Sequence, residues 1–131
     1  MLSGVGTDMK VLIADDSVQI WERLIEMPSE LPEVEIMGEA GDAPEAIREI
    51  RRLDPDMVIL DIRMPGGNGI DVLKSITQNA SHPAIIMLTN YPYPQYKKKC
   101  MDLGADYFFD KSTEFEKVVE VCEQLIKVSV V

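Results

Sequence analysis

"MVILD", residues 57–61, decides the fold, because it places four consecutive apolar residues directly before a carboxylate. A continuous apolar run of this length is typical of a strand covered on both faces, as in a parallel sheet. Further short apolar runs lie at residues 9–14, 34–38, 84–88 and 106–109. Five runs separated by helical patterns predict an α/β fold with a parallel sheet.

Segments between and after the runs have apolar residues three and four positions apart, which predicts five helices. The last pattern, over residues 115–126, is the clearest, and the one around residues 94–103 is the weakest. Asp42 and Asn68, the latter with Asp71 three residues later, are typical helix caps. The apolar stripe predicted for the first helix comprises Val18, Trp21, Leu24 and Ile25.

Length and charge narrow the class of protein. The 131 residues suffice for one domain, which we expect to span residues 9–128 after a short N-terminal extension at 1–8. A net charge of −10 argues against sequence-independent binding to nucleic acid or anionic membranes. No secretory signal and no apolar run near the roughly 20 residues of a membrane span is present, so we expect a cytoplasmic protein. Cys100 and Cys122 form no motif and are expected to be free thiols.

Polar residues follow four of the apolar runs, and ligands of a parallel sheet bind beyond the carboxyl ends of its strands. These residues are Asp15, Asp16, Asp61, Thr89 and Lys111. Three carboxylates in one cleft suit Mg²⁺, while a lysine and a threonine can bind phosphoryl oxygens. A carboxylate can itself accept a phosphoryl group.

The adjacent pair Asp15-Asp16 requires an explanation, since two carboxylates about 5 Å apart repel by about 3 kcal/mol at an effective dielectric of about 20. A divalent cation would offset this repulsion. The simpler alternative is a solvated turn in which Asp16 caps the following helix. Asp61 taken alone has an equally simple alternative as the first residue of a loop.

Five stretches of the chain resemble the bacterial response-regulator receiver domain, in its order and spacing, over about residues 8–128. They are "VLIADDS", "GEAGDAPEAI", "PDMVILDIRMPGGNGIDVL", "IIMLT" and "GADYFFDKS". The resemblance implies a flavodoxin-like three-layer sandwich, with a five-stranded parallel sheet in the order 2-1-3-4-5 and five helices. It also implies a two-component signalling module with no output domain in this chain.

The resemblance implies a role for each residue that matches the family's motifs. Asp61 matches the phosphoacceptor, and Lys111 matches the lysine that binds the phosphoryl group. Asp15 and Asp16 match the acid pair that binds Mg²⁺, and Arg63 matches the residue whose backbone carbonyl is a further ligand. Thr89 and Phe108 match the switch pair. Asp16 is the nearer match to the direct metal ligand. For Phe108, a plain core role is equally compatible.

The implied partners are proteins. A histidine kinase or phosphotransfer protein would donate to Asp61, and a downstream protein or the chain's own output domain would respond. Nucleic acid and membranes are not expected as partners of this chain. The domain would be a monomer or a phosphorylation-dependent dimer.

Two other functions compete with signalling. Many phosphohydrolases with an aspartate nucleophile have a second acid two residues later, and Arg63 occupies that position here. A pseudo-receiver that only binds a partner would not need the complete set of acids, threonine and lysine. We therefore expect a phosphoacceptor regulator and not an enzyme acting on an outside substrate.

The chain departs from the family's common pattern at two positions that follow site residues. Ser112 follows Lys111 where proline is frequent, and Asn90 follows Thr89 where a small residue is common. Arg63 and Tyr91 should flank the path of water to Asp61, with Arg63 either paired with phosphoryl oxygens or stacked on Tyr91, and neither has a group that orients an attacking water. With the added bulk of Asn90, this pattern predicts slow loss of the phosphoryl group. The simpler alternative is that the side chains of Arg63 and Tyr91 both point to solvent.

Overall fold

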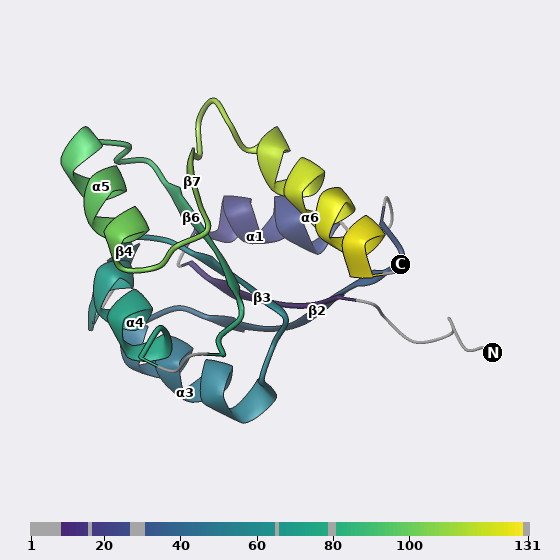
Figure 1. The fold of residues 1–131 in the computed structure, drawn as a ribbon, viewed down its shortest axis with the longest axis horizontal. Coiled ribbons are helices and arrows are strands. Elements are labelled where there is room, and N and C mark those ends of the chain that lie inside the picture. The colour runs from purple at the N-terminus through teal and green to yellow at the C-terminus, as the bar shows by residue number, and fades with distance from the viewer. Residues whose placement is uncertain (1–8, 16, 27–30, 65, 79–80, 130–131) are drawn as a thin grey trace.

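Five parallel strands form the central sheet of the computed structural model, which describes residues 9–15, 17–26, 31–64, 66–78 and 81–129 (Figure 1). They are β1 (Met9–Ala14), β2 (Val34–Ala40), β3 (Met57–Leu60), β6 (Ala84–Thr89) and β7 (Tyr107–Asp110). The spatial order β2-β1-β3-β6-β7 is the predicted order 2-1-3-4-5, because β4 (Arg63–Met64) and β5 (Gly67–Asn68) form a separate antiparallel pair.

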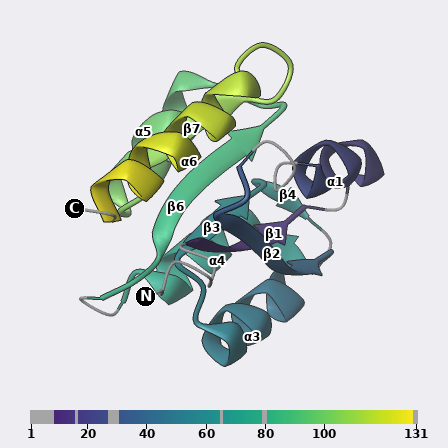
Figure 2. The same cartoon turned by 90° about the vertical axis from the view of Figure 1, so that its right-hand side faces the viewer.

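Helices cover both faces of the sheet. Within the described residues these are α1 (Val18–Ile25), α3 (Ala43–Leu53), α4 (Gly69–Ile76), α5 (Pro94–Asp102) and α6 (Glu116–Ser129). Figures 1 and 2 show α1 and α6 on one face and α3 and α4 on the other, with α5 beside β7. None of the helices in this part of the chain is long and apolar enough to cross a membrane.

Alternation along the strands produces two separate apolar cores. Leu12 and Ala14 of β1 pack towards α3 and α4, while Val11 and Ile13 pack towards α1 and α6. The strands β3 and β6 divide their residues in the same way, which explains why their sequences are apolar throughout. The prediction that the central strands are covered on both faces is therefore confirmed.

Both predicted helix caps are present. The Asp42 carboxylate accepts a hydrogen bond from the Glu45 N–H, and Asn68 and Asp71 form a reciprocal capping box. The possible cap at Asp16 is wrong, because Ser17 is the N-cap of α1 and its hydroxyl accepts a bond from the Ile20 N–H. Asp16 itself lies outside the described residues.

The predicted stripe of α1 is only partly correct. Ile20 and Leu24 are the buried residues of this helix, whereas Val18 and Ile25 are 68% and 56% exposed. Trp21 is partly buried and packs against the core, so of the predicted stripe only Val18 and Ile25 face solvent.

Candidate functional site

Four polar side chains meet at one edge of the sheet, where the carboxyl ends of neighbouring strands come together. They are Asp15 after β1, Asp61 after β3, Thr89 at the end of β6 and Lys111 after β7. All four are buried, with between 0% and 6% of their surface exposed. Backbone bonds from Asp61 N–H to Ala14 and from Lys111 N–H to Thr89 extend the ladder of the sheet to this edge and fix the positions.

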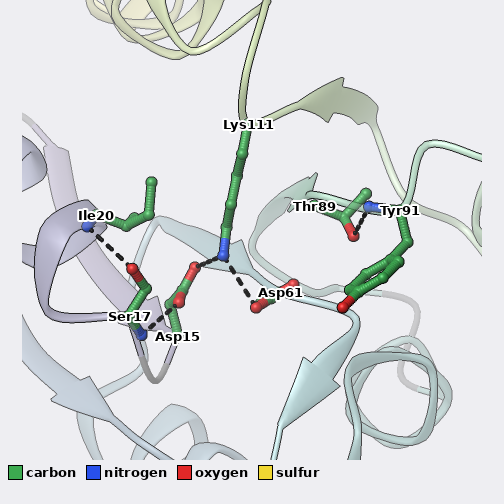
Figure 3. A network of polar contacts seen from close by, with 7 residues as sticks. All are labelled: Asp15, Ser17, Ile20, Asp61, Thr89, Tyr91 and Lys111. Carbon is green, nitrogen blue, oxygen red and sulfur yellow. Dashed lines mark hydrogen bonds and ion pairs between the residues drawn. The ribbon is translucent and has the colours of Figure 1, made fainter.

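The Lys111 ammonium lies between two carboxylates (Figure 3). Its Nζ is 2.7 Å from Asp15 Oδ2 and 3.0 Å from Asp61 Oδ2. The other oxygen of Asp15 accepts a bond of 2.8 Å from the Ser17 N–H. Among the described residues, Asp61 Oδ1 is buried and has no hydrogen-bond partner, and Asp15 Oδ2 has no contact other than its ion pair with Lys111.

Burial and the neighbouring charges set the protonation of this group. Burial raises the pKa of Asp61, the Asp15 charge raises it further, and Lys111 only partly opposes this. For Lys111, burial acts to lower the pKa, but the contacts with Asp15 and Asp61 outweigh it and the pKa is raised. A buried lysine whose pKa is raised therefore stands beside a carboxylate that is costly to ionise.

The hydroxyl of Thr89 lies on the other side of Asp61 from Lys111 (Figure 3). Thr89 Oγ1 accepts a bond of 2.9 Å from the Tyr91 N–H. The Arg63 guanidinium stacks on Tyr91, with Cζ 4.1 Å from the ring centroid. Phe108 is separate from this polar group: it is 8% exposed and packs in the core on the α3 and α4 face.

Comparison with known proteins identifies the family. Residues 11–123 match the response regulator receiver domain. The chain belongs to this family. A protein-glutamate methylesterase/protein-glutamine glutaminase of Syntrophomonas wolfei is 36% identical over 121 residues, which are 90% of this chain and 34% of that protein. The chain spans between 23% and 52% of the length of the first curated relatives it matches.

Solved structures of similar proteins agree with this assignment. The response regulator domain of Thermotoga maritima CheB has a TM-score of 0.77 and 28% identity, with 92% of this chain and 95% of that chain covered. CheY from a CheX-CheY-BeF3-Mg²⁺ complex of Borrelia burgdorferi has a TM-score of 0.74 and 29% identity, covering 88% and 90%. The resemblance and the fold predicted from the sequence are thus confirmed, and the chain is a receiver domain of two-component signalling.

Magnesium is a cofactor of receiver domains in general, and the donor set here is compatible with it. The free Oδ1 of Asp61 is a hard oxygen ligand in a buried site next to a second carboxylate, Asp15. No group of three acidic, histidine or cysteine side chains stands ready to hold a metal within the described part of the chain. The third expected acid, Asp16, lies outside it.

The loop after Asp61 depends on glycines that sequence reasoning did not single out. A Cβ at Gly69 would run into the carbonyl oxygen of Asp61, and the Gly69 N–H donates to the Ile62 carbonyl. Gly66 and Gly67 have φ values of 74° and 141°, which side chains rarely permit. The glycines in "GGNG" were the available signal for this close approach.

Lys111 is held by a turn that the sequence did not predict. The N–H and hydroxyl of Ser112 both donate to Asp110 Oδ1, at 2.9 and 2.7 Å. These bonds lower the pKa of Asp110 and close a turn directly around Lys111. Ser112 therefore provides a local constraint at the position where the family often has proline.

Proposed function

We propose that Asp61 accepts a phosphoryl group from a phosphohistidine of a histidine kinase or phosphotransfer protein, and that this modification controls a partner-binding surface. The observation that supports this is the buried carboxylate whose Oδ2 pairs with Lys111 while Oδ1 has no hydrogen-bond partner within the described part of the chain. In the transfer, Asp61 Oδ1 forms the new bond to phosphorus and the bond from phosphorus to the imidazole nitrogen breaks. Lys111 then neutralises charge on the transferred group.

The proposed magnesium ligands are Asp15, Asp16, Asp61 and the Arg63 carbonyl. When bound, the ion neutralises phosphoryl oxygens and thereby lowers the cost of bringing anionic groups together. Lys111 remains in ionic contact with Asp15, which orients the ammonium towards Asp61. Ser17 fixes the other oxygen of Asp15, so the acid cannot turn away from the site.

The donor protein needs a surface beside Asp61, and α1 provides one. A groove of about 490 Å³ lies beside α1 and is lined by Val18, Trp21, Ile25 and four acids that include Asp15. The combination of three apolar side chains and four acids suits an amphipathic helix that also has basic residues. Because Asp15 contacts Lys111 and Lys111 contacts Asp61, a donor seated in the groove is close to the acceptor.

The proposed response involves Thr89 and Phe108. A phosphoryl oxygen on Asp61 would accept the O–H of Thr89, whose oxygen accepts a bond from the Tyr91 N–H, so phosphorylation ties the loop after β6 to the acceptor. Phe108 pairs with Met87 across β6 and β7, two residues before Thr89, so a shift of β6 reaches the core around Phe108. Residues 9–128 form the receiver unit in this proposal, and the output belongs to a partner or to a further domain.

Intact mass spectrometry tests the phosphoacceptor. The full chain is incubated with acetyl phosphate, with and without Mg²⁺, and we expect one added phosphoryl group only when Mg²⁺ is present. Asp61→Asn should abolish the gain, whereas Asp102→Asn, a change at an exposed acid paired with Lys98, should leave it intact. Full incorporation in the Asp61 variant would refute the assignment.

A further inference from the structure

The backbone of Lys111 is fixed on both sides by hydrogen bonds that do not involve the acceptor. The Lys111 N–H donates to the Thr89 carbonyl at 2.8 Å, which fixes the start of the loop to the sheet. Directly after Lys111, the N–H and the hydroxyl of Ser112 both donate to Asp110 Oδ1, at 2.9 and 2.7 Å. The residue that contacts Asp61 therefore lies inside a turn that Asp110 and Ser112 close.

The backbone of Asp110 is in turn held by the chain that leads into α6. The Glu114 N–H donates to the Asp110 carbonyl at 2.8 Å, and Glu114 Oε1 accepts a bond of 3.1 Å from the Asp110 N–H. The other carboxylate oxygen of Glu114 pairs with the Lys117 ammonium, 2.7 Å away. Asp110 thus has a defined position from which its carboxylate reaches Ser112.

Phosphoryl transfer changes what holds the Lys111 ammonium. Before transfer, its Nζ contacts Asp15 and Asp61, and Figure 3 shows the side chain extended towards both. To neutralise charge on the arriving group, the ammonium has to give up part of its contact with Asp61. Because a lysine side chain is long and flexible, its backbone anchor then decides how accurately the ammonium reaches the phosphoryl oxygens.

We propose that Asp110 and Ser112 are positioning residues for phosphoryl transfer, which act by fixing the backbone from which the Lys111 ammonium reaches Asp61. This inference rests on the proposed roles of Asp61 and Lys111 in the transfer. The Asp110 carboxylate acts on the turn alone, so its effect on the reaction passes through Lys111. What the turn requires of Asp110 is an acceptor oxygen and not a charge.

The rate of phosphorylation tests this role. The full chain is incubated with acetyl phosphate and Mg²⁺, and the added phosphoryl group is followed over time by intact mass spectrometry. In this reaction Asp61 Oδ1 forms a bond to phosphorus, while the bond from phosphorus to the acetyl oxygen breaks and acetate leaves with the electron pair. Asp110→Ala removes the acceptor of both bonds and should lower the rate about fivefold, whereas Ser112→Ala keeps the N–H bond and should lower it less.

Two variants separate the loss of the acceptor oxygen from the loss of a charge. Asp110→Asn keeps an acceptor oxygen for Ser112 and should retain nearly the wild-type rate. Asp102→Ala removes an exposed acidic charge that pairs with Lys98 and should leave the rate unchanged. A rate in Asp110→Asn as low as that in Asp110→Ala would overturn the proposal, because the charge and not the hydrogen bonds would then be responsible.

Removal of Lys111 separates positioning from general damage to the fold. In a Lys111→Met background, where we expect slow transfer, Asp110→Ala and Ser112→Ala should have no further effect, because the side chain that they position is gone. An equal loss of rate with and without Lys111 would overturn the proposal, as would the wild-type rate in both alanine variants.

Circular dichroism checks that each variant folds. If Asp110→Ala does not fold, the rates of Ser112→Ala with and without Lys111 decide by the same criteria. A wild-type chain that gains no phosphoryl group would refute the proposed function, and this inference with it.

Discussion

Replacing Asp61 by asparagine should stabilise the metal-free protein at neutral pH. Asp61 Oδ2 and Asp15 Oδ2 both contact the same ammonium, at 3.0 and 2.7 Å, so they lie within about 6 Å of each other. At an effective dielectric of about 20, the repulsion is about 3 kcal/mol, and lost attraction to Lys111 offsets part of it. Because the pKa of Asp61 is raised, its charge is a net cost to the fold. We expect a gain of about 1–2 kcal/mol.

The pH dependence follows from the direction of the same shift. Below the ordinary pKa of 3.8, a carboxyl group whose pKa is raised by folding is protonated in both the folded and the unfolded state. At such pH values Asp61 has no charge in either state, so its ionisation does not lower the stability of the fold. The cost appears as pH rises from 3.8 through the folded-state pKa and is complete above it. The advantage of Asp61→Asn should therefore be larger at neutral pH and shrink as the pH falls towards 3.8.

Urea unfolding in a buffer with chelator, followed by circular dichroism, measures this difference. Asp102→Asn is the control, since its solvent-screened ion pair with Lys98 should contribute little to the free energy of unfolding. Added Mg²⁺ should stabilise the wild type and not the Asp61 variant. An Asp61→Asn protein that is no more stable than wild type at neutral pH would refute this account of the buried charges.

Three further predictions concern the same fold. Lys111→Met leaves Asp15 and Asp61 buried without a cation, so it should lower the free energy of unfolding in urea by about 3–5 kcal/mol, and adding Asp61→Asn should restore part of the loss. An unchanged urea midpoint would contradict the buried ion pairs. In the same assay, Gly69→Ala should lower the free energy of unfolding by about 3 kcal/mol because the added Cβ clashes with Asp61, whereas Gly41→Ala has open space around the added Cβ and should be nearly neutral. Equal effects of the two changes would contradict the close approach of Gly69 to Asp61. Burial raises the pKa of Cys100 to about 11 and of Cys122 to about 12, so neither free thiol should react with iodoacetamide at neutral pH until urea unfolds the chain. Alkylation of the native protein, detected by mass spectrometry, would contradict this burial.

The sheet and the placement of the site were predictable because they depend on patterns within short segments. "MVIL" and "AIIML" are apolar throughout, and this property alone indicates central strands. Topology then brings Asp15, Asp61, Thr89 and Lys111 to one edge, so their convergence followed from strand order.

The details that escaped prediction depend on contacts between distant segments. The periodicity of α1 contains two apolar stripes, and only packing against the sheet selects Ile20 and Leu24 as the buried one. The steric need for Gly69 arises from the backbone of Asp61, which the sequence of α4 does not reveal. The sequence left three arrangements open for Arg63, which could pair with phosphoryl oxygens, stack on Tyr91 or point to solvent, and only the fold identifies the stack.

Helix α5 contributes a single fully buried side chain, Cys100, to the interior, whereas α4 contributes four buried residues. Local opening of a helix costs roughly what its buried contacts are worth, so α5 is the part of the sandwich that opens most readily without global unfolding. Its remaining anchors, Tyr96 and Leu103, are only partly buried. Amide protons of α5 are therefore expected to exchange with solvent faster than those of α4, and a small free-energy change at the sheet edge suffices to redistribute this helix between docked and opened forms.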